Sequence, residues 1–578
     1  MRAGILLLWY MIAGFKTIWA GDSLFISRLP LRDFIHPLAI PPEASGSFGE
    51  PRRLHFHTGI DFKTQQREGI DVWAAADGWI SRVVISGTGY GNALYISHAN
   101  GYVTVYGHLQ RFAPEIQAWI RKIQYSQKKS WIDYTVPKGE MLIRQGEVIA
   151  YSGNSGGSGG PHLHFEIRDS LERILNPALM GCGFPDNDAP RFSAVKIYPA
   201  DDRKHIGGGL RKAVEKKGEQ YFISDTLRVH ADSASIAVQC SDWVNNKQNA
   251  IGLWDLQCRF DDTLIYRFTA NRFSFDEKRC VCAHTDYTIF MREDQRVFHK
   301  CFIEPGNHAE DFYPESRNRG IFHLKKNRVH RLDVIASDIA GNTASLTCHV
   351  MYEDTPSVFF PAEDKSKKMD FLLLRSRMNE LQQPGFRLKV PGVVLYDDMP
   401  VSIRRIPSVR KGTASDGFQI ADDTHILDKE AEIYISPFTA AQRIADKLVV
   451  VQEDAKGKVT ARKSERNGDM IKAVIREFGL FYILPDTTAP SVKPIFVTKG
   501  KPNRLKGSIP FQVKDNLSGI RDMDAYVDGR WEVLTYDAKS NRLAFTPEEN
   551  FSPGAHSIRL RVTDEKENET TGTWSFIW

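Results

Sequence analysis

The sequence predicts a mainly β protein built from several domains. Its 578 residues exceed a single domain of roughly 100 to 200 residues. Hydrophobic residues make up 42% and charged residues 25% of the chain, ordinary globular values that exclude a disordered, collagen-like or multi-span membrane protein. Short strand-like runs alternate with Gly-rich turns between residues 47 and 182, and Asp/Asn/Gly loops typical of β-hairpins recur after residue 185.

The charge is nearly balanced, with 76 lysines and arginines against 71 aspartates and glutamates. The formal net charge is +5, and the two signs are interspersed along the chain. A nucleic-acid-binding protein instead gathers its basic residues on one face. We therefore expect no nucleic acid among the partners.

The first 20 residues have the layout of a secretory signal peptide. Met1 and Arg2 precede an apolar run over 5–15, and a short stretch then leads to Ala20. This run is shorter than the about 20 apolar residues that cross a bilayer, and Lys16 interrupts it. We expect cleavage near Ala20, an exported mature chain and no later transmembrane span. An uncleaved anchor is the alternative.

Seven cysteines have to be interpreted for an exported chain, in which disulfides can form. Six lie between residues 240 and 348, and Cys182 stands apart. Cys240 alternates with Ile236 and Val238, as a small core-facing residue of a strand does. Disulfides and free buried thiols both stay open. A cysteine zinc site is disfavoured because the chain has no Cys-x-x-Cys pair.

The first half of the chain divides into an arm and a β-rich domain. Residues 21–46 are rich in proline and lack periodicity, which indicates a linker or arm. Residues 47–185 form the β-rich domain, with strand-like runs at 72–75, 79–85, 93–97, 103–106, 146–151 and 162–167. One helix is predicted from Pro114, because Ile116, Trp119, Ile120 and Ile123 have helical spacing. This helix either walls a groove or covers a sheet.

Two later segments resemble one another. Each opens with an acidic-to-proline linker that starts at Asp188 or Asp486, and each closes with an Asp-to-Asn loop before an alternating strand. The loops are Asp338-Ile-Ala-Gly-Asn342 and Asp564-Glu-Lys-Glu-Asn568. Such loops predict two immunoglobulin-like sandwiches. Asx turns explain the aspartates, with a metal role as the alternative. The predicted boundaries are 186–355 and 487–578 for the sandwiches and 356–486 for a β-rich middle domain.

Histidines and one aspartate of the β-rich domain occur in three Gly-flanked motifs. The motifs are His57-Thr-Gly-Ile-Asp61, Tyr106-Gly-His108-Leu109 and Gly160-Pro-His162-Leu-His164-Phe-Glu166. A catalytic zinc takes three protein ligands from histidine and carboxylate and keeps a fourth position for water. His57, Asp61 and one histidine of the last motif complete such a set. His55 is the rival ligand by strand parity, but His57 alone stands four residues before Asp61.

The last motif divides its two histidines between two tasks. Alternate side chains of a strand share a face, so His162 and His164 point one way while Leu163 packs behind them. One histidine can bind the metal. The other, with an ordinary pKa of about 6.5, can act as general base for a water whose pKa the metal lowers toward about 7. His108 can polarise the same site from a neighbouring strand, and a purely structural cluster is the alternative.

These motifs resemble the LytM/lysostaphin-type zinc metallo-endopeptidases, which cleave peptide bonds in bacterial peptidoglycan. The resemblance covers residues 47–178 and includes VWAAADG at 72–78, Tyr90-Gly91-Asn92 and the long stretch over 152–166. It implies an antiparallel β domain with a narrow groove for an extended peptide. It also implies that His57, Asp61 and His164 bind Zn²⁺, that His162 is the general base and that His108 stabilises the tetrahedral transition state.

Two departures from compact members concern the groove. The insert between Leu109 and Pro137 is longer, and the stretch Pro51-Arg52-Arg53 replaces a segment that often carries a transition-state-stabilising tyrosine, so no residue is assigned there. The long β-rich extension resembles those of Gram-negative envelope members. This likeness implies a periplasmic protein that acts on peptidoglycan peptide stems.

The predicted function is a zinc-dependent endopeptidase that hydrolyses the peptide crosslinks of peptidoglycan, with a zinc-bound water as the nucleophile. The alternative is a non-catalytic regulator, since some LytM-type domains have lost their ligands and activate cell-wall amidases. Every expected ligand and base position is present in this chain, which favours the enzyme. The partner of the extension is not predicted.

Overall fold

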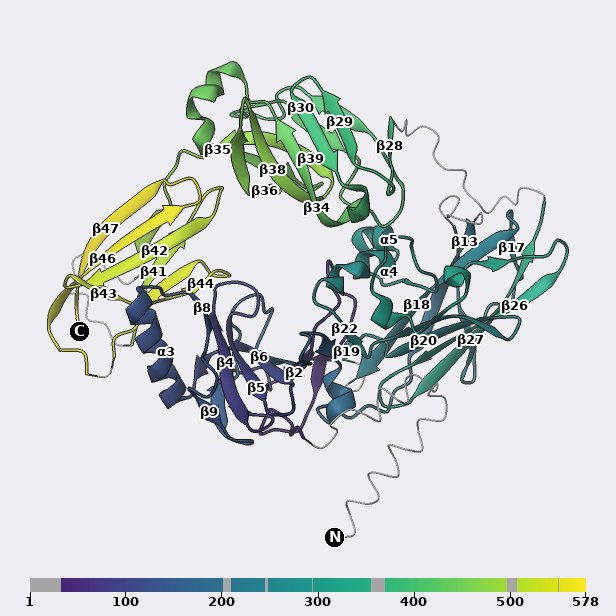
Figure 1. Cartoon of the computed structure of the whole chain (residues 1–578), viewed down its shortest axis with the longest axis horizontal. Coiled ribbons are helices and arrows are strands. Elements are labelled where there is room, and N and C mark those ends of the chain that lie inside the picture. Colours follow the sequence, from purple (N-terminus) through teal and green to yellow (C-terminus); the bar gives the residue numbers. More distant parts are fainter. Residues whose placement is uncertain are drawn as a thin grey trace, which may run out of the picture.

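The protein is a mainly β molecule, as predicted. The computed structural model describes residues 33–200, 209–244, 248–293, 295–354, 370–495, 507–548 and 550–578. Figure 1 shows four β regions that follow one another around a ring, with the last beside the helix of the first. The predicted signal peptide, 1–20, lies outside the described residues. Within the described ranges, no helix is both long and apolar enough to cross a membrane.

The N-terminal region contains most of one ten-stranded sheet. The strands of the region, in both of its sheets, are β1 (Ala44–Gly46), β2 (Ile60–Lys63), β3 (Asp71–Trp73), β4 (Gly78–Ile85), β5 (Asn92–His98), β6 (Val103–Leu109), β7 (Arg111–Phe112), β8 (Ile132–Thr135), β9 (Leu142–Ile143), β10 (Val148–Tyr151), β11 (His162–Arg168) and β12 (Ile174–Leu175). The main path of the sheet is β1-β2-β11-β6-β5-β4-β8, and neighbouring strands along it are antiparallel. A smaller sheet has the order β3-β10-β7.

Strand β11 lies inside this sheet, between β2 and β6, and its side chains alternate between the two faces. Leu163, Phe165 and Ile167 are fully buried in the apolar core of the region. His164 and Glu166, also buried, alternate with them and therefore lie on the opposite face. The period of two predicted from the sequence thus places His164 away from the apolar core.

Two further segments cover the core of the N-terminal region. The predicted helix is α3 (Pro114–Gln127), which buries Ile116 and Ile120 in that core. The predicted arm also contributes, because Phe34 and Leu38 pack into the same core and β1 pairs with β2. The described part of the arm is therefore packed on the domain that follows it.

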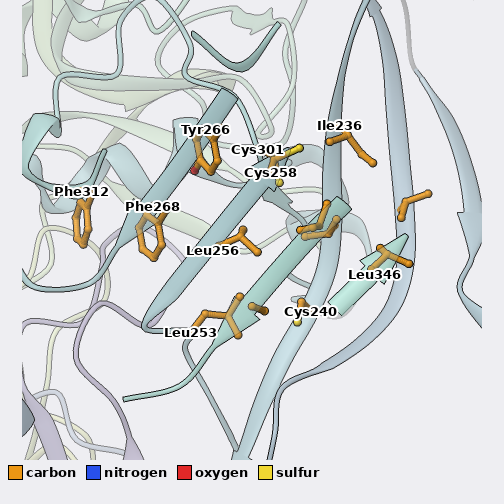
Figure 2. Packing of buried hydrophobic residues seen from close by; sticks show 14 of the residues in the cluster. Ile236, Cys240, Leu253, Leu256, Cys258, Tyr266, Phe268, Cys301, Phe312 and Leu346 are labelled. Atoms are coloured by element: carbon orange, nitrogen blue, oxygen red, sulfur yellow. The ribbon is translucent and has the colours of Figure 1, made fainter. Parts of the chain in front are cut away.

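The second region has two sheets around one apolar cluster (Figure 2). Its elements are β13 (Arg191–Ala200), β14 (Leu210–Ala213), β15 (Glu215–Lys217), β16 (Gln220–Phe222), β17 (Leu227–Val229), β18 (Ser233–Val244), β19 (Asn249–Ile251), β20 (Asp255–Phe260), β21 (Thr263–Thr269), β22 (Arg272–Phe273), α4 (Val281–His284), α5 (Tyr287–Arg292), β23 (His299–Lys300), β24 (Glu315–Ser316), β25 (Phe322–His323), β26 (Val329–Ser337) and β27 (Thr343–Tyr352). The sheet paths are β14-β13-β18-β19 and β15-β16-β27-β26-β20-β21-β24.

The cysteines of the chain lie inside these cores. All seven are buried and free, and Cys240, Cys258 and Cys301 point into the cluster drawn in Figure 2. The alternation of Cys240 with Ile236 and Val238 therefore reflects packing in a strand.

The third and fourth regions are also paired sheets. The third comprises β28 (Phe371–Leu373), β29 (Asn379–Gln383), β30 (Phe386–Val390), β31 (Met399–Val401), β32 (Ile403–Ile406), β33 (Gly417–Ile420), β34 (Ile426–Ile435), β35 (Leu448–Glu453), β36 (Val459–Ala461), β37 (Ser464–Asn467), β38 (Met470–Glu477) and β39 (Gly479–Pro485). The fourth comprises β40 (Ser491–Pro494), β41 (Ile509–Lys514), β42 (Ile520–Val527), β43 (Arg530–Glu532), β44 (Leu534–Asp537), β45 (Arg542–Phe545), β46 (Ala555–Asp564) and β47 (Glu569–Ile577). Each surrounds its own apolar core. The immunoglobulin-like family of the second and fourth regions stays a prediction.

Candidate metal centre

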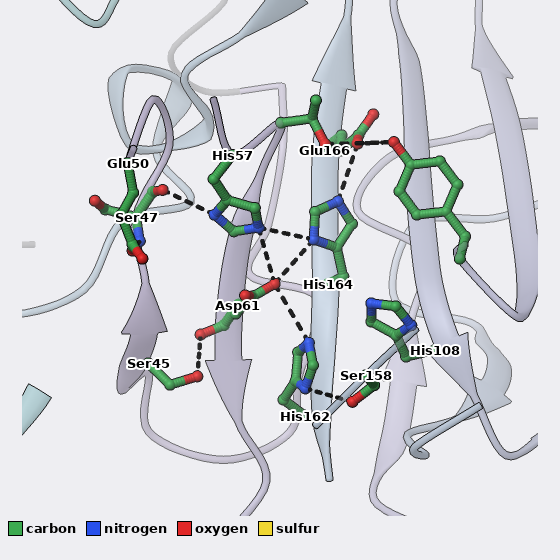
Figure 3. Close-up of polar contacts among 12 residues, drawn as sticks. Ser45, Ser47, Glu50, His57, Asp61, His108, Ser158, His162, His164 and Glu166 are labelled. Carbon is green, nitrogen blue, oxygen red and sulfur yellow. Dashed lines mark hydrogen bonds and ion pairs between the residues drawn. The ribbon is translucent and has the colours of Figure 1, made fainter. Parts of the chain in front are cut away.

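Three of the sequence-predicted residues meet on one face of the large sheet (Figure 3). His57 precedes β2, Asp61 lies on β2, and His164 lies opposite Asp61 on the paired strand β11. His57 Nε2, Asp61 Oδ1 and His164 Nδ1 are 2.9–3.1 Å from one another, and all three residues are buried. Ligands bound at about 2.0–2.1 Å to one tetrahedral zinc have donor atoms about 3.3 Å apart. The size of this triangle therefore suits such an ion.

Hydrogen bonds on the far side of each ring orient both histidines. His57 Nδ1 lies 2.8 Å from the carbonyl oxygen of Ser47, and His164 Nε2 lies 2.9 Å from Glu166 Oε1. Because these oxygens can only accept, the facing nitrogens carry protons and the lone pairs of the other nitrogens turn toward Asp61. Three lone pairs thus converge on one point, with the outer hydrogen bonds that metal-binding histidines typically have. The donor set fits a divalent metal ion.

Burial and charge act differently on the two histidines. Burial and the nearby Arg52 guanidinium lower the pKa of His57 to about 4. Burial acts in the same direction on His164, but its hydrogen bonds to Asp61 and Glu166 outweigh it and raise the pKa of His164 to about 9. The two carboxylates therefore favour positive charge at His164, which a bound cation would supply.

A second layer of charged residues holds these ligands. Glu166 accepts hydrogen bonds from Tyr90 Oη at 2.5 Å and from Arg168 Nη2 at 2.7 Å. Arg52 Nη2 donates to the other carboxylate oxygen of Asp61 at 2.5 Å. The sequence assigned no role to Arg52. The fold of the loop before His57 brings this guanidinium to Asp61, nine residues away in sequence. No motif around Arg52 in the sequence indicated that contact.

The other two predicted histidines border the same point. His162 Nδ1 lies 2.9 Å from the carbonyl oxygen of Gly160, while its buried Nε2 has no hydrogen-bond partner among the described residues and lies 3.4 Å from Asp61 Oδ1. The His108 ring centroid is 4.8 Å from that of His162. Burial, with the charges of His164 and His162, lowers the pKa of His108 to about 3.

The rival ligand His55 is not among the residues of this cluster. The structure brings all five predicted site residues together: His57, Asp61, His108, His162 and His164. The first and last of them are 107 residues apart in sequence. Their arrangement can hold one metal ion and present one free imidazole nitrogen beside it.

Comparison with protein families agrees with the predicted resemblance to LytM/lysostaphin-type peptidases. Residues 55–125 match the model of Peptidase family M23, and residues 372–486 match that of the Zu5-like domain. The M23 match includes His57, Asp61 and His108. The predicted resemblance of the N-terminal region is confirmed.

Two curated relatives align with the same part of the chain. A DD-carboxypeptidase/endopeptidase Mpg of Neisseria meningitidis is 36% identical over 143 residues, which are 24% of this chain and 27% of the relative. Peptidoglycan DD-endopeptidase ShyC of Vibrio cholerae is 33% identical over 124 residues, 20% of this chain and 23% of the relative. The chain thus matches about a quarter of the length of these relatives.

A solved structure of a zinc containing peptidase from Vibrio cholerae is similar over 27% of this chain and 41% of that chain, with 28% sequence identity and a TM-score of 0.19.

Proposed function

We propose that this protein is a zinc-dependent endopeptidase that hydrolyses the peptide crosslinks of bacterial peptidoglycan in the cell envelope. The named peptidoglycan endopeptidases among its relatives support a peptidase acting on this polymer. The observation that carries the proposal is His162 Nε2, which has no hydrogen-bond partner among the described residues and lies 3.4 Å from Asp61 Oδ1, beside three convergent lone pairs. A purely structural cluster would satisfy this buried nitrogen.

The residues of the centre divide the work. His57 Nε2, Asp61 Oδ1 and His164 Nδ1 would hold the ion, while Arg52 and Glu166 fix the orientation of Asp61 and His164. Bound zinc supplies Lewis acidity, which polarises the scissile carbonyl and lowers the pKa of a water molecule.

His162 is suited to accept a proton in this centre. Its Nδ1 donates to the carbonyl oxygen of Gly160, so Nε2 carries a lone pair and faces the ligands. It can take a proton from the attacking water and pass it to the leaving amine. The Nδ1 of His108 donates to the carbonyl oxygen of Ser155. His108 can therefore stabilise an oxyanion only when Nε2 is protonated as well, a state that negative charge on the substrate favours.

Metal content and hydrolysis of purified muropeptides, measured on the same preparations, test this proposal. We expect about one zinc per wild-type chain, loss of zinc and activity in His164→Ala, and retained zinc with at least about 100-fold lower activity in His162→Ala. His55→Ala is the matched control, because this histidine is half-buried near the centre but lies outside the cluster. It should keep both zinc and activity.

The alternative is a regulator that activates a cell-wall amidase without hydrolysing peptides itself. Wild-type protein that binds zinc but leaves muropeptides intact, or that binds no zinc at all, would contradict the enzyme. Stimulation of an added amidase by that same protein would then favour the regulator.

A further inference from the structure

The second and fourth regions each contain three clustered aspartates at corresponding places. The first Asp triplet is Asp186, Asp242 and Asp338, and the second Asp triplet is Asp486, Asp515 and Asp564. In both, one aspartate lies in the linker before the region, one at or near the end of a strand, and one next to the hairpin before the last strand. In the sequence Asp188 aligned with Asp486, but the structure puts Asp186 in that place.

Hydrogen bonds repeat in the two triplets as well. Asp338 accepts from the backbone N–H and the side-chain amide of Asn342, and Asp564 accepts the same two bonds from Asn568. These asparagines also donate to the carbonyl oxygens of the two linker residues, Asp186 at 3.4 Å and Asp486 at 3.0 Å. The same local structure thus occurs twice in one chain.

The two hydrogen bonds from Asn342 satisfy both oxygens of Asp338, but only one oxygen of each of the other two aspartates has a partner. In the first triplet, Asp186 Oδ1 and Asp242 Oδ1 accept backbone N–H groups, but the Oδ2 atoms of both residues have no hydrogen-bond partner among the described residues. Asp242 is fully buried. Burying an ionised oxygen without a partner is costly, so a partner is expected at this position.

The second triplet leaves the corresponding atoms free. Asp486 Oδ2 and Asp515 Oδ2 accept backbone N–H groups, whereas the Oδ1 atoms of both residues have no hydrogen-bond partner in the part of the chain that the structure describes. Asp486 is fully buried. The positive charge of Lys566, which lies close enough to act on Asp486, offsets part of the negative charge here.

We propose that each Asp triplet binds one calcium ion, which ties the linker to the β region that follows it. Within each triplet, one oxygen from every aspartate lies within 4.8 Å of the others. Two oxygens bound to one Ca²⁺ at about 2.3–2.6 Å cannot be more than about 5 Å apart, so the triplets have the right size. A set made only of oxygens selects a hard cation rather than zinc.

A shared proton is the other occupant that the first triplet allows. Burial, together with the charges of Asp186 and Asp338, raises the pKa of Asp242 to about 9. A protonated carboxyl group would relieve the same repulsion without an ion. Calcium and the proton therefore compete for the same carboxylates, and only a binding measurement separates them.

Calcium would act on the arrangement of the regions. Asp186 lies where the N-terminal region meets the second, and the backbone N–H of Asp486 donates to the carbonyl oxygen of Lys447 in the third. An ion held by a linker and by two aspartates of the next region restricts rotation at that junction. Two such ions would stiffen two junctions of the ring in Figure 1.

Equilibrium dialysis of the full chain against radioactive calcium tests the proposal. The buffer is cleared of metals by a chelating resin, and calcium is then added stepwise to about 10 mM. We expect about two calcium ions bound per chain, with Kd values of about 10⁻⁴ to 10⁻³ M. Asp242→Asn and Asp515→Asn should each remove one ion, and the double variant both. Asp333→Asn is the control, because Asp333 lies in the second region outside the triplet. It should keep two.

Thermal unfolding supplies a second measurement that does not depend on the variants. Calcium chloride should raise the unfolding temperature of the wild type more than magnesium chloride at the same concentration. No saturable binding up to about 10 mM, unchanged binding in the double variant, or an equal effect of magnesium would overturn the proposal. The first of these results would leave the shared proton as the occupant of the first triplet.

Discussion

Within the described residues, the N-terminal region contacts both the second and the fourth region, and these two contacts are built differently. Its contact with the second region is a continuation of an apolar core. Its contact with the fourth region closes the ring of Figure 1 through polar groups and partly exposed rings. The first contact is part of the fold of the metal centre, whereas the second is a docking surface.

The contact with the second region begins directly before His57, one of the three candidate metal ligands. Phe56 is fully buried and its ring centroid lies 4.5 Å from that of Phe312. Strand β12 pairs with β22, which extends the large sheet into the second region. The backbone N–H of Gly252 also donates to Ser47 Oγ at 3.0 Å, and the carbonyl of Ser47 orients His57. The second region therefore supports the loop that carries His57.

The contact with the fourth region uses the insert that departs from compact peptidases. Tyr125 Oη donates to Glu532 Oε2 at 2.7 Å, and the Trp131 ring lies 5.7 Å from that of Tyr536. Lys539 Nζ contacts Asn154 and donates to the carbonyl oxygen of Ser158 at 3.1 Å. A cavity of about 200 Å³ stays open within this contact. The packing is looser than that around Phe56.

Removal of everything after residue 185 should have the largest effect. The cut exposes the aromatic cluster around Phe48 and Phe56 and removes β22, so we expect an aggregating chain without muropeptide hydrolysis. A chain that ends at residue 486 should stay folded and bind zinc, because it keeps the second region. Size-exclusion chromatography and zinc content measure both. A monomeric, active fragment ending at 185 would show that the core is not shared.

Phe56→Ala should have the next largest effect. Loss of a fully buried phenylalanine side chain typically lowers the free energy of unfolding by about 3–5 kcal/mol, and the adjacent His57 should lose order, with weaker zinc binding. Phe275→Ala is the control, since Phe275 is 42% exposed. Denaturant unfolding and zinc titration compare the two. Equal destabilisation by both substitutions would argue against a shared core.

Lys539→Ala should have a smaller effect, limited to docking. Exposed ionic contacts contribute about 1 kcal/mol or less, so the docked fraction should change by no more than about fivefold. Lys539 binds the carbonyl oxygen of Ser158, and Ser158 Oγ lies 3.1 Å from His162 Nδ1, so the fourth region is docked beside His162. Release of Lys539 should therefore raise the hydrolysis of large substrates and leave the unfolding temperature unchanged. Arg530→Ala, an exposed residue of the same region, is the control. A fall in activity would mean that the fourth region helps to form the site.

A pH effect should be the smallest, at the contact between the second and third regions. Hydrogen bonds to Asp428 and Cys280 raise the pKa of His308 to about 10, and Glu277 also lies near it. Because this value exceeds the ordinary pKa of about 6.5, the stabilisation is complete below about pH 6.5 and is lost as the pH rises through about 10. Solvent screening limits it to about 1 kcal/mol.

Urea unfolding of the wild type and of His308→Gln at pH 6, 8 and 10 measures this effect. The difference in unfolding free energy between the two proteins should shrink toward pH 10. A difference that stays constant over this range would assign the contact to packing alone.

Local patterns in the sequence determined much of this protein. Period-two alternation on β11 and helical spacing after Pro114 predicted this strand and the helix, because each depends on neighbouring residues. The three Gly-flanked motifs named the five residues that the structure brings together. The repeated Asp-to-Asn loops likewise marked the aspartates of the hairpins. They did not identify Asp186, since only the folded linker brings it to Asp242.

The tertiary structure decided what depends on residues far apart in the chain. No local pattern indicates that Arg52 holds Asp61 or that Phe56 belongs to the core of the next region. Nor does one indicate that Tyr125 contacts Glu532, 407 positions further along the chain. Hydrophobic burial and electrostatic pairing depend on distance in space, and no local period encodes which distant surfaces meet. The motifs supply the side chains of the candidate centre, and the packing of whole regions decided how that centre is supported and approached.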